Sequence, residues 1–186
     1  KGFMKHQHSL RIIGGKWRSR KVSFANCAEI RPTSDRIRET LFNWLMHHVN
    51  GARCLDLFSG SGILGIEALS RGASGLTFIE EHEEIAAHLE QNLAELKANH
   101  FDILITDAAA YLEATDQVFD IIFLDPPFGG DHLQLAIATI AKRKLSSSFV
   151  YIESESVSAF NSLPDNWRIY RQKKAGRVYY GLITIP

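Results

Sequence analysis

The sequence predicts a doubly wound α/β fold whose sheet is mostly parallel, with an antiparallel edge at the C-terminus. From residue 52 onward, short β-branched and aromatic runs alternate with segments of helical periodicity. Such alternation is typical of a parallel sheet covered by helices on both faces. The last two apolar runs flank Ala175-Gly176 closely, as the strands of an antiparallel pair would.

The N-terminal third predicts a small hairpin followed by a helix. Residues 10–25 alternate loosely around Gly14-Gly15, a turn signal, and residues 26–32 are expected to form a loop. The helix is expected to end near His48, and three residues can cap its start: Thr33, Ser34 and Asp35. Its apolar stripe is Ile37, Leu41, Trp44 and Leu45.

The remaining elements follow the same alternation. Strands are expected at 52–58, 76–79, 101–106, 119–124, 149–153, 167–172 and 178–185. Helices are expected from the glycine-rich loop at 60–62 to about residue 70, and at 82–98, 108–113 and 131–142.

Composition limits the class of protein. A chain of 186 residues with 45% hydrophobic and 23% charged residues fits one globular domain with a small appendage. No apolar run reaches the roughly 18 to 20 residues that span a bilayer, and no signal-peptide pattern is present, so we expect a cytoplasmic protein. Two cysteines, Cys27 and Cys54, are too few for a disulfide framework, and no metal-ligand spacing occurs, so we expect no metal.

Overall neutrality conceals a basic N-terminal segment. Residues 1–38 hold 10 Lys and Arg against 2 Asp and Glu, whereas the remainder holds 11 against 19, which gives net charges of +8 and −8. A charge run is usually a solvated tail. This one contains Ile12, Trp17 and Phe24, so we predict a structured arm that contacts nucleic acid. The domain boundary is placed near residue 30, with a basic β-extension at 1–30 and the main domain at 31–186.

The most informative stretch follows the apolar run 119–124. Asp125, Pro126, Pro127 and Phe128 form a rigid corner, because each proline fixes φ and removes an N–H donor. The corner offers an acceptor oxygen, carbonyls and a flat apolar surface, which together suit a planar ring bearing an exocyclic amine. The alternative is that the prolines only stop a strand.

A glycine-rich loop predicts a nucleoside-containing cofactor. Residues 60–65 match Gly-x-Gly-x-x-Gly between a strand and a helix, and Glu80 lies about 20 residues further on, where a carboxylate can hold ribose hydroxyls. Asp56 beside the loop would repel a pyrophosphate but would suit an ammonium, which favours S-adenosylmethionine over NAD. Asp107 can accept from an adenine amine. Each of these carboxylates has a plain turn or N-cap role as its alternative.

The chain resembles class I S-adenosylmethionine-dependent methyltransferases that modify exocyclic amines. The resemblance rests on the order and spacing of the glycine loop, Glu80, Asp107 and Asp-Pro-Pro-Phe. The segments 11–18, 31–45 and 55–72 are in addition similar to RsmD-type bacterial 16S rRNA guanine-N2 methyltransferases. The likeness runs from about residue 11 to the end. It implies a Rossmann-like seven-stranded sheet with a small N-terminal β-extension, acting on a partly assembled 30S subunit. The sequence does not fix the oligomeric state, for which we expect a monomer.

The resemblance also implies site residues. The cofactor would be held by Asp56, Phe58, Gly60, Gly62, Glu80 and Asp107. The target base would be held by Asp125, Pro126 and Phe128. From the basic N-terminal segment, and not from the resemblance, we expect RNA contacts at Arg11, Lys16, Arg18, Arg20, Arg31, Arg36 and Arg38. The chain departs from the family pattern at two places. Ser19 stands where glycine is expected. Glu80-Glu81-His82 replaces Glu-x-Asp/Asn, so the sequence does not predict whether a second residue there contacts the cofactor.

Several alternatives remain at this point. An adenine-N6 methyltransferase or a glutamine amide methyltransferase would use a related Asp/Asn-Pro-Pro-aromatic corner, although the arginine-rich arm argues against the amide substrate. A non-catalytic rRNA-binding assembly factor is a different class, and a dehydrogenase is the least favoured.

Overall fold

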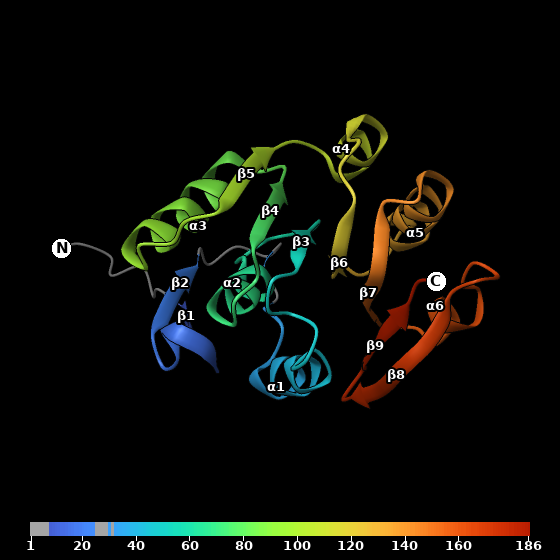
Figure 1. Cartoon of the computed structure of the whole chain (residues 1–186), viewed down its shortest axis with the longest axis horizontal. Helices are drawn as coiled ribbons and strands as arrows, with labels where there is room; N and C mark the ends of the chain where they lie inside the picture. Colours follow the sequence, from blue (N-terminus) through green and yellow to red (C-terminus); the bar gives the residue numbers. More distant parts are fainter. Residues whose placement is uncertain (1–7, 25–29, 31) are drawn as a thin grey trace.

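A seven-stranded sheet forms the centre of the molecule (Figure 1). The computed structural model describes residues 8–24, 30 and 32–186. The spatial strand order is β5-β4-β3-β6-β7-β9-β8. The strands are β3 (Arg53–Asp56), β4 (Gly75–Glu80), β5 (Phe101–Ile105), β6 (Phe119–Leu124), β7 (Ser146–Ser154), β8 (Arg168–Ala175) and β9 (Val178–Thr184). Strands β3 to β7 are parallel and β9 is antiparallel to β7 and β8, which confirms the predicted mixed sheet.

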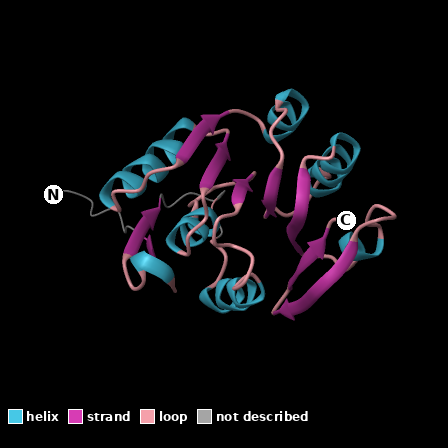
Figure 2. Cartoon of the chain, in the orientation of Figure 1, coloured by secondary structure: helices cyan, strands magenta, loops and turns pink. Residues whose placement is uncertain are grey.

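Helices cover both faces of the sheet and divide the hydrophobic core into two clusters (Figure 2). One face carries α1 (Asp35–Trp44), α2 (Ile63–Ser70) and α3 (Glu83–Glu95). The other carries α4 (Ala108–Ala114), α5 (His132–Arg143) and α6 (Ser158–Asn161). The sequence does not predict α6, because four residues are too few to show a helical period. None of the described helices is both long and apolar enough to cross a membrane.

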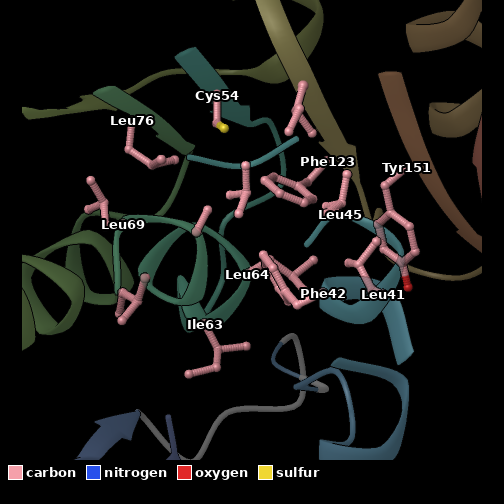
Figure 3. Packing of buried hydrophobic residues seen from close by; sticks show 14 of the residues in the cluster. Leu41, Phe42, Leu45, Cys54, Ile63, Leu64, Leu69, Leu76, Phe123 and Tyr151 are labelled. Atoms are coloured by element: carbon pink, nitrogen blue, oxygen red, sulfur yellow. The ribbon is translucent and has the colours of Figure 1, made fainter. Parts of the chain in front are cut away.

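The core beneath α1 and α2 is closely packed (Figure 3). Phe42 of α1 packs against Phe123 of β6, with ring centroids 6.0 Å apart. A Cβ at Gly65 would lie 2.3 Å from the Phe78 ring, so only glycine lets α2 approach the sheet this closely. The third glycine of the loop motif therefore has a packing role. Helix α1 ends at Trp44 rather than near His48, and the chain continues in turns.

The predicted N-terminal hairpin is present, although its connection is longer than a two-residue turn. Strands β1 (His8–Arg11) and β2 (Lys21–Phe24) pair antiparallel, and the 3₁₀ helix η1 (Gly15–Trp17) lies between them. Ser19 adopts φ 70°, a left-handed conformation that favours the glycine expected there. The hairpin is anchored to the main domain, because the Trp17 side chain is buried and the backbone N–H of Trp17 donates to Oγ of Ser70 at 3.0 Å.

A buried ion pair joins the hairpin to the main domain. The side chains of Arg38 and Glu67 have no exposed surface, and Nη1 of Arg38 lies 3.4 Å from Oε2 of Glu67. Arg38 also donates to the carbonyl oxygens of Arg11 at 2.9 Å and Thr33 at 3.2 Å, and it pairs with Asp35. The expected RNA contact at Arg38 is therefore wrong, because protein groups surround its guanidinium. Its role is to connect α1, α2 and the hairpin.

Candidate active site

A cavity of about 1020 Å³ lies at the carboxyl ends of the parallel strands. Its walls come from the ends of β3 to β7, the start of α1 and the turn between β8 and β9. Strand order reverses between β3 and β6, and ligands bind α/β sheets at such a switch point. Eight of the nine residues predicted for the cofactor and target base line this cavity: Asp56, Phe58, Gly60, Glu80, Asp107, Asp125, Pro126 and Phe128.

The ninth, Gly62, supports the loop from behind. Both Gly60 and Gly62 are left-handed, at φ 52° and 75°. Space around Gly60 is open, whereas a Cβ at Gly62 would lie 2.3 Å from the Leu89 side chain of α3. Gly60 donates its N–H to Oε2 of Glu80 at 2.9 Å, which ties the loop to the end of β4. Gly60 therefore faces the cavity, and Gly62 lets the loop pack on α3.

Asp56 is a buried carboxyl group at the end of β3. Its side chain accepts a hydrogen bond from the N–H of Gly65 at 3.1 Å. Burial raises the pKa of Asp56 to about 7, with a smaller contribution from the negative charge of Glu80, and the hydrogen bond from Gly65 opposes this rise. A buried carboxylate that lacks a cationic partner would be stabilised by a ligand ammonium. This chemistry fits the amino group of a bound amino-acid moiety.

Two further carboxylates line the same half of the cavity. Oε1 of Glu80 lies 3.1 Å from the backbone nitrogen of His82 and 3.0 Å from its ring Nδ1. The departure from Glu-x-Asp/Asn thus places an imidazole against Glu80. Asp107 caps α4, because its Oδ2 accepts from the N–H of Ala110 at 2.9 Å, and its side chain is exposed at the cavity. Asp107 is both an N-cap and a cavity residue.

The other half of the cavity contains the Asp-Pro-Pro-Phe corner. Asp125 follows β6 directly, and its Oδ2 accepts a hydrogen bond from the hydroxyl of Thr33 at 3.0 Å. Phe128 is half-buried and lines the cavity beyond the prolines. The sequence predicts Thr33 only as a possible helix cap. In the structure Ser34 caps α1, by accepting from Ile37, so Thr33 is available to hold Asp125.

Glu153 is a site residue that sequence reasoning does not identify. It is 4% exposed, lies near the end of β7, and lines the cavity together with Asp125, whose pKa its carboxyl group influences. The hydroxyl of Tyr151 donates to Oε1 of Glu153 at 2.6 Å. Burial, followed by the charge and hydrogen bond of Glu153, raises the pKa of Asp125 well above its usual range, while the hydrogen bond from Thr33 lowers it. The protonation of Asp125 therefore depends on Glu153 as well as on burial.

Among the described residues, none of those expected to contact RNA lines the cavity. The exposed members are Arg11, Lys16, Arg18, Arg20 and Arg36, and Arg31 lies outside the described residues. The turn of the hairpin packs on the C-terminal ends of α2 and α3, where Nη2 of Arg20 lies 3.0 Å from the carbonyl oxygen of Glu95. The cavity adjoins the N-terminal ends of the same helices. Contacts at the hairpin turn would be remote from a base in the cavity.

Comparison with known proteins identifies the family. A family model described as Conserved hypothetical protein 95 matches residues 10–184. The chain belongs to this family. A relative named Ribosomal RNA small subunit methyltransferase D, from Escherichia coli (strain K12), is 42% identical over 175 residues, which covers 93% of this chain and 88% of the relative. The resemblance to RsmD-type methyltransferases is confirmed.

Solved structures agree with this family assignment. A structure from Escherichia coli, described as a proposed methyltransferase, has a TM-score of 0.89 at 41% identity and covers 96% of this chain and 98% of its own. A Thermus thermophilus 16S rRNA N2 G1207 methyltransferase, in complex with AdoMet and guanosine, has a TM-score of 0.73 at 18% identity, covering 97% of this chain and 50% of its own. At that identity the likeness shows the fold, which is that of class I methyltransferases.

Proposed function

We propose that this chain transfers the methyl group of S-adenosylmethionine to the exocyclic N2 amine of a guanine in 16S ribosomal RNA, within a partly assembled 30S subunit. One observation carries the proposal. The Asp-Pro-Pro-Phe corner opens into the same cavity as Gly60, Asp56, Glu80 and Asp107. The half of the cavity that would hold the cofactor, at Asp56, Gly60, Glu80 and Asp107, thus adjoins the half that would hold the base, at the Asp-Pro-Pro-Phe corner. Direct transfer between two bound molecules requires this proximity. The names of the family relatives support rRNA as the substrate.

The cofactor half fits S-adenosylmethionine by its chemistry. Asp56 would hold the ammonium of the methionine moiety, and Glu80 the ribose hydroxyls. Asp107 would accept from the adenine amine, beside Phe58 and Gly60. The bound cofactor supplies a methyl group on a sulfonium, which is a good leaving group, and leaves as S-adenosylhomocysteine. The chain's main task is therefore alignment of the base nitrogen.

The base half would activate a weak nucleophile. The lone pair of a guanine amine is delocalised into the ring. If the Asp125 carboxylate and the Pro126 carbonyl accept its two N–H bonds, they favour a pyramidal nitrogen and stabilise the positive charge that develops on it. The base nitrogen gains a methyl group and loses one proton, which Asp125 or water accepts. Phe128 would stack on the base, which must leave its helical stack or already lie in a loop.

Two neighbours of Asp125, Glu153 and Thr33, adjust how readily its carboxylate accepts a proton in this scheme. The Thr33 hydroxyl stabilises the Asp125 carboxylate, whereas burial and the negative charge of Glu153 favour its protonated form. The raised pKa of Asp125 then makes it a competent proton acceptor after transfer. The hydroxyl of Tyr151 stabilises the same pair through Glu153.

The test is transfer of labelled methyl groups to RNA. Purified protein is incubated with labelled S-adenosylmethionine and three substrates, which are naked 16S rRNA, partly assembled 30S particles and 23S rRNA. We expect label in 16S rRNA, most efficiently in the particle. Asp125→Ala should abolish transfer while calorimetry shows unchanged S-adenosylmethionine binding. The proposal is overturned if wild-type protein labels none of the RNAs, or if Asp125→Ala retains full activity.

A further inference from the structure

The C-terminal edge of the sheet carries a second basic surface, separate from the N-terminal arm. Strand β8 and the turn after it contain five cations, namely Arg168, Arg171, Lys173, Lys174 and Arg177. No acidic residue follows Asp165, whereas residues 39–165 hold 19 Asp and Glu against 6 Lys and Arg. The five cations are all exposed. A local cationic strip on a strongly acidic body is the pattern expected of a polyanion contact.

Aromatic side chains lie among these cations. Tyr170 is 36% exposed, and the guanidinium of Arg171 lies 4.4 Å from its ring centroid. Nζ of Lys174 lies 5.0 Å from the ring centroid of Tyr179. Proteins that bind single-stranded nucleic acid combine a positive track with aromatic rings on which bases stack. Tyr170 also contacts Phe149 on the α1 face of the sheet, whereas Tyr179 packs on the opposite face. The edge strand therefore presents cations and aromatic rings on both of its faces.

The orientation of β8 brings this surface to the cavity. Both β7 and β8 are antiparallel to β9, so the carboxyl end of β8 lies at the cavity edge of the sheet. Ala175 and Val178, which flank the turn, line the cavity itself. Lys173, Lys174 and Arg177 accordingly lie near its rim. The strip extends from there for roughly 20 Å toward Arg168, at about 3.3 Å per residue.

The two basic surfaces lie at opposite ends of the molecule. In Figure 1, β8 forms the right edge of the sheet, while β1 and β2 pack on the left, beside α2 and α3. The hairpin turn is remote from the cavity, so it cannot hold the phosphates next to a base bound there. The β8 surface can.

We propose that β8 and the β8–β9 turn form a second RNA-binding surface, which holds the phosphates adjacent to the target base. The proposal rests on the proposed function, because it assumes an RNA substrate. Its competitor is protection of an open sheet edge, since charged residues, lysine above all, also prevent edge strands from pairing with other chains. The two explanations predict different behaviour when the charges are removed.

The test compares two triple variants that each remove three positive charges. Lys173→Gln/Lys174→Gln/Arg177→Gln changes the proposed surface, and Lys97→Gln/Lys142→Gln/Lys144→Gln changes exposed lysines elsewhere. For the β8 variant we expect at least about tenfold weaker binding of 16S rRNA. The slope of log affinity against log salt concentration should become less negative by up to about two. Each lost single-strand phosphate contact accounts for roughly 0.7 of that slope. Binding of S-adenosylmethionine and kcat at saturating RNA should remain within about twofold of wild type. The control variant should bind RNA nearly as wild type does.

Equal RNA affinity and salt dependence in wild type and the β8 variant would overturn the proposal, and so would equal weakening in both variants. If the β8 variant forms oligomers in size-exclusion chromatography yet binds RNA normally, edge protection is the correct explanation. Ultraviolet cross-linking of wild-type protein to RNA tests the site of contact independently. We expect adducts at Tyr170 or Tyr179. Adducts confined to residues 8–24 would contradict the proposal. If wild-type protein methylates no RNA, the proposed function itself has failed.

Discussion

The hydroxyl of Thr33 donates to Oδ2 of Asp125 at 3.0 Å, and this contact joins the start of α1 to the end of β6. The residues are 92 positions apart in the chain, yet they meet at the corner where the target base would bind. On the other side, Asp125 meets Glu153. Burial raises the pKa of Asp125, Glu153 raises it further and Thr33 lowers it, so two separate elements adjust the protonation of the proposed acceptor.

Substitution of these two neighbours should shift the pH dependence of methyl transfer in opposite directions. The acceptor role requires the Asp125 carboxylate, so kcat should rise with pH as Asp125 loses its proton. Thr33→Val removes a bond that lowers this pKa and should move the rise to higher pH. Glu153→Gln removes the charge that raises it and should move the rise to lower pH. At pH 7 we expect Thr33→Val to lose about tenfold in kcat, as for a charged hydrogen bond worth about 1.5 kcal/mol.

The measurement is kcat at saturating RNA and cofactor from about pH 5 to 9, with unfolding followed at each pH to exclude a stability effect. Shifts in the same direction, or profiles that coincide with wild type, would show that Asp125 is not the titrating acceptor.

Asp56→Asn should separate cofactor binding from stability. The folded protein raises the pKa of Asp56 to about 7 from 3.8, so the folded state binds more protons than the unfolded state between these values. This group's contribution to stability therefore falls as pH rises through that window. Asparagine removes the effect, so the apo variant should be at least as stable as wild type at pH 8. Its affinity for S-adenosylmethionine should fall by roughly tenfold or more, because the ammonium loses its charged partner. Thermal unfolding and calorimetry at pH 6 and 8 test both points; unchanged cofactor affinity would remove Asp56 from the site.

The two loop glycines should respond differently to alanine. Gly62→Ala combines a left-handed φ with a contact to Leu89, and should cost about 2 to 5 kcal/mol of stability. Gly60→Ala has the strained φ but open space, so we expect a loss of about 1 to 2 kcal/mol together with weaker cofactor binding. Urea unfolding and calorimetry distinguish them. Equal destabilisation by the two substitutions would contradict the assigned roles.

Arg36 and Arg38 are two residues apart but should have unrelated roles. Arg38→Ala breaks a buried ion pair with Glu67 and should destabilise the protein by about 3 kcal/mol or more. Arg36 is exposed, so Arg36→Ala should change stability by less than about 0.5 kcal/mol and should reduce only RNA affinity. Denaturant melts and RNA-binding titrations of both variants provide the comparison. A stable Arg38→Ala protein would show that the buried pair does not hold the hairpin in place.

Much of the fold follows from local sequence pattern. The mixed sheet can be predicted from the sequence, because each buried strand is a short apolar run and the glycine loop marks the first strand-to-helix turn. The strand order is not encoded in any single segment, since it depends on which strands pair at a distance. Arg38 illustrates the same limit: a charged residue off the apolar stripe of a helix is normally exposed, and only the tertiary packing of the hairpin encloses it.

The candidate site could be predicted where a motif marks it and not elsewhere. Asp56, Glu80 and Asp125 each end a strand, in a pattern tied to known chemistry. Glu153 also ends a strand, but nothing in its neighbourhood distinguishes it from a solvated glutamate. The sequence predicts Thr33 only as a possible helix cap, because its contact with Asp125 depends on how α1 docks on the sheet.

Nucleoside analysis of the methylated RNA is the most direct test of the central claim. After transfer from labelled S-adenosylmethionine, 16S rRNA is digested to nucleosides, and the labelled product is identified by chromatography and mass spectrometry. We predict label in N2-methylguanosine, and none in the Asp125→Ala reaction. Label in N6-methyladenosine, or no labelled nucleoside at all, would contradict it.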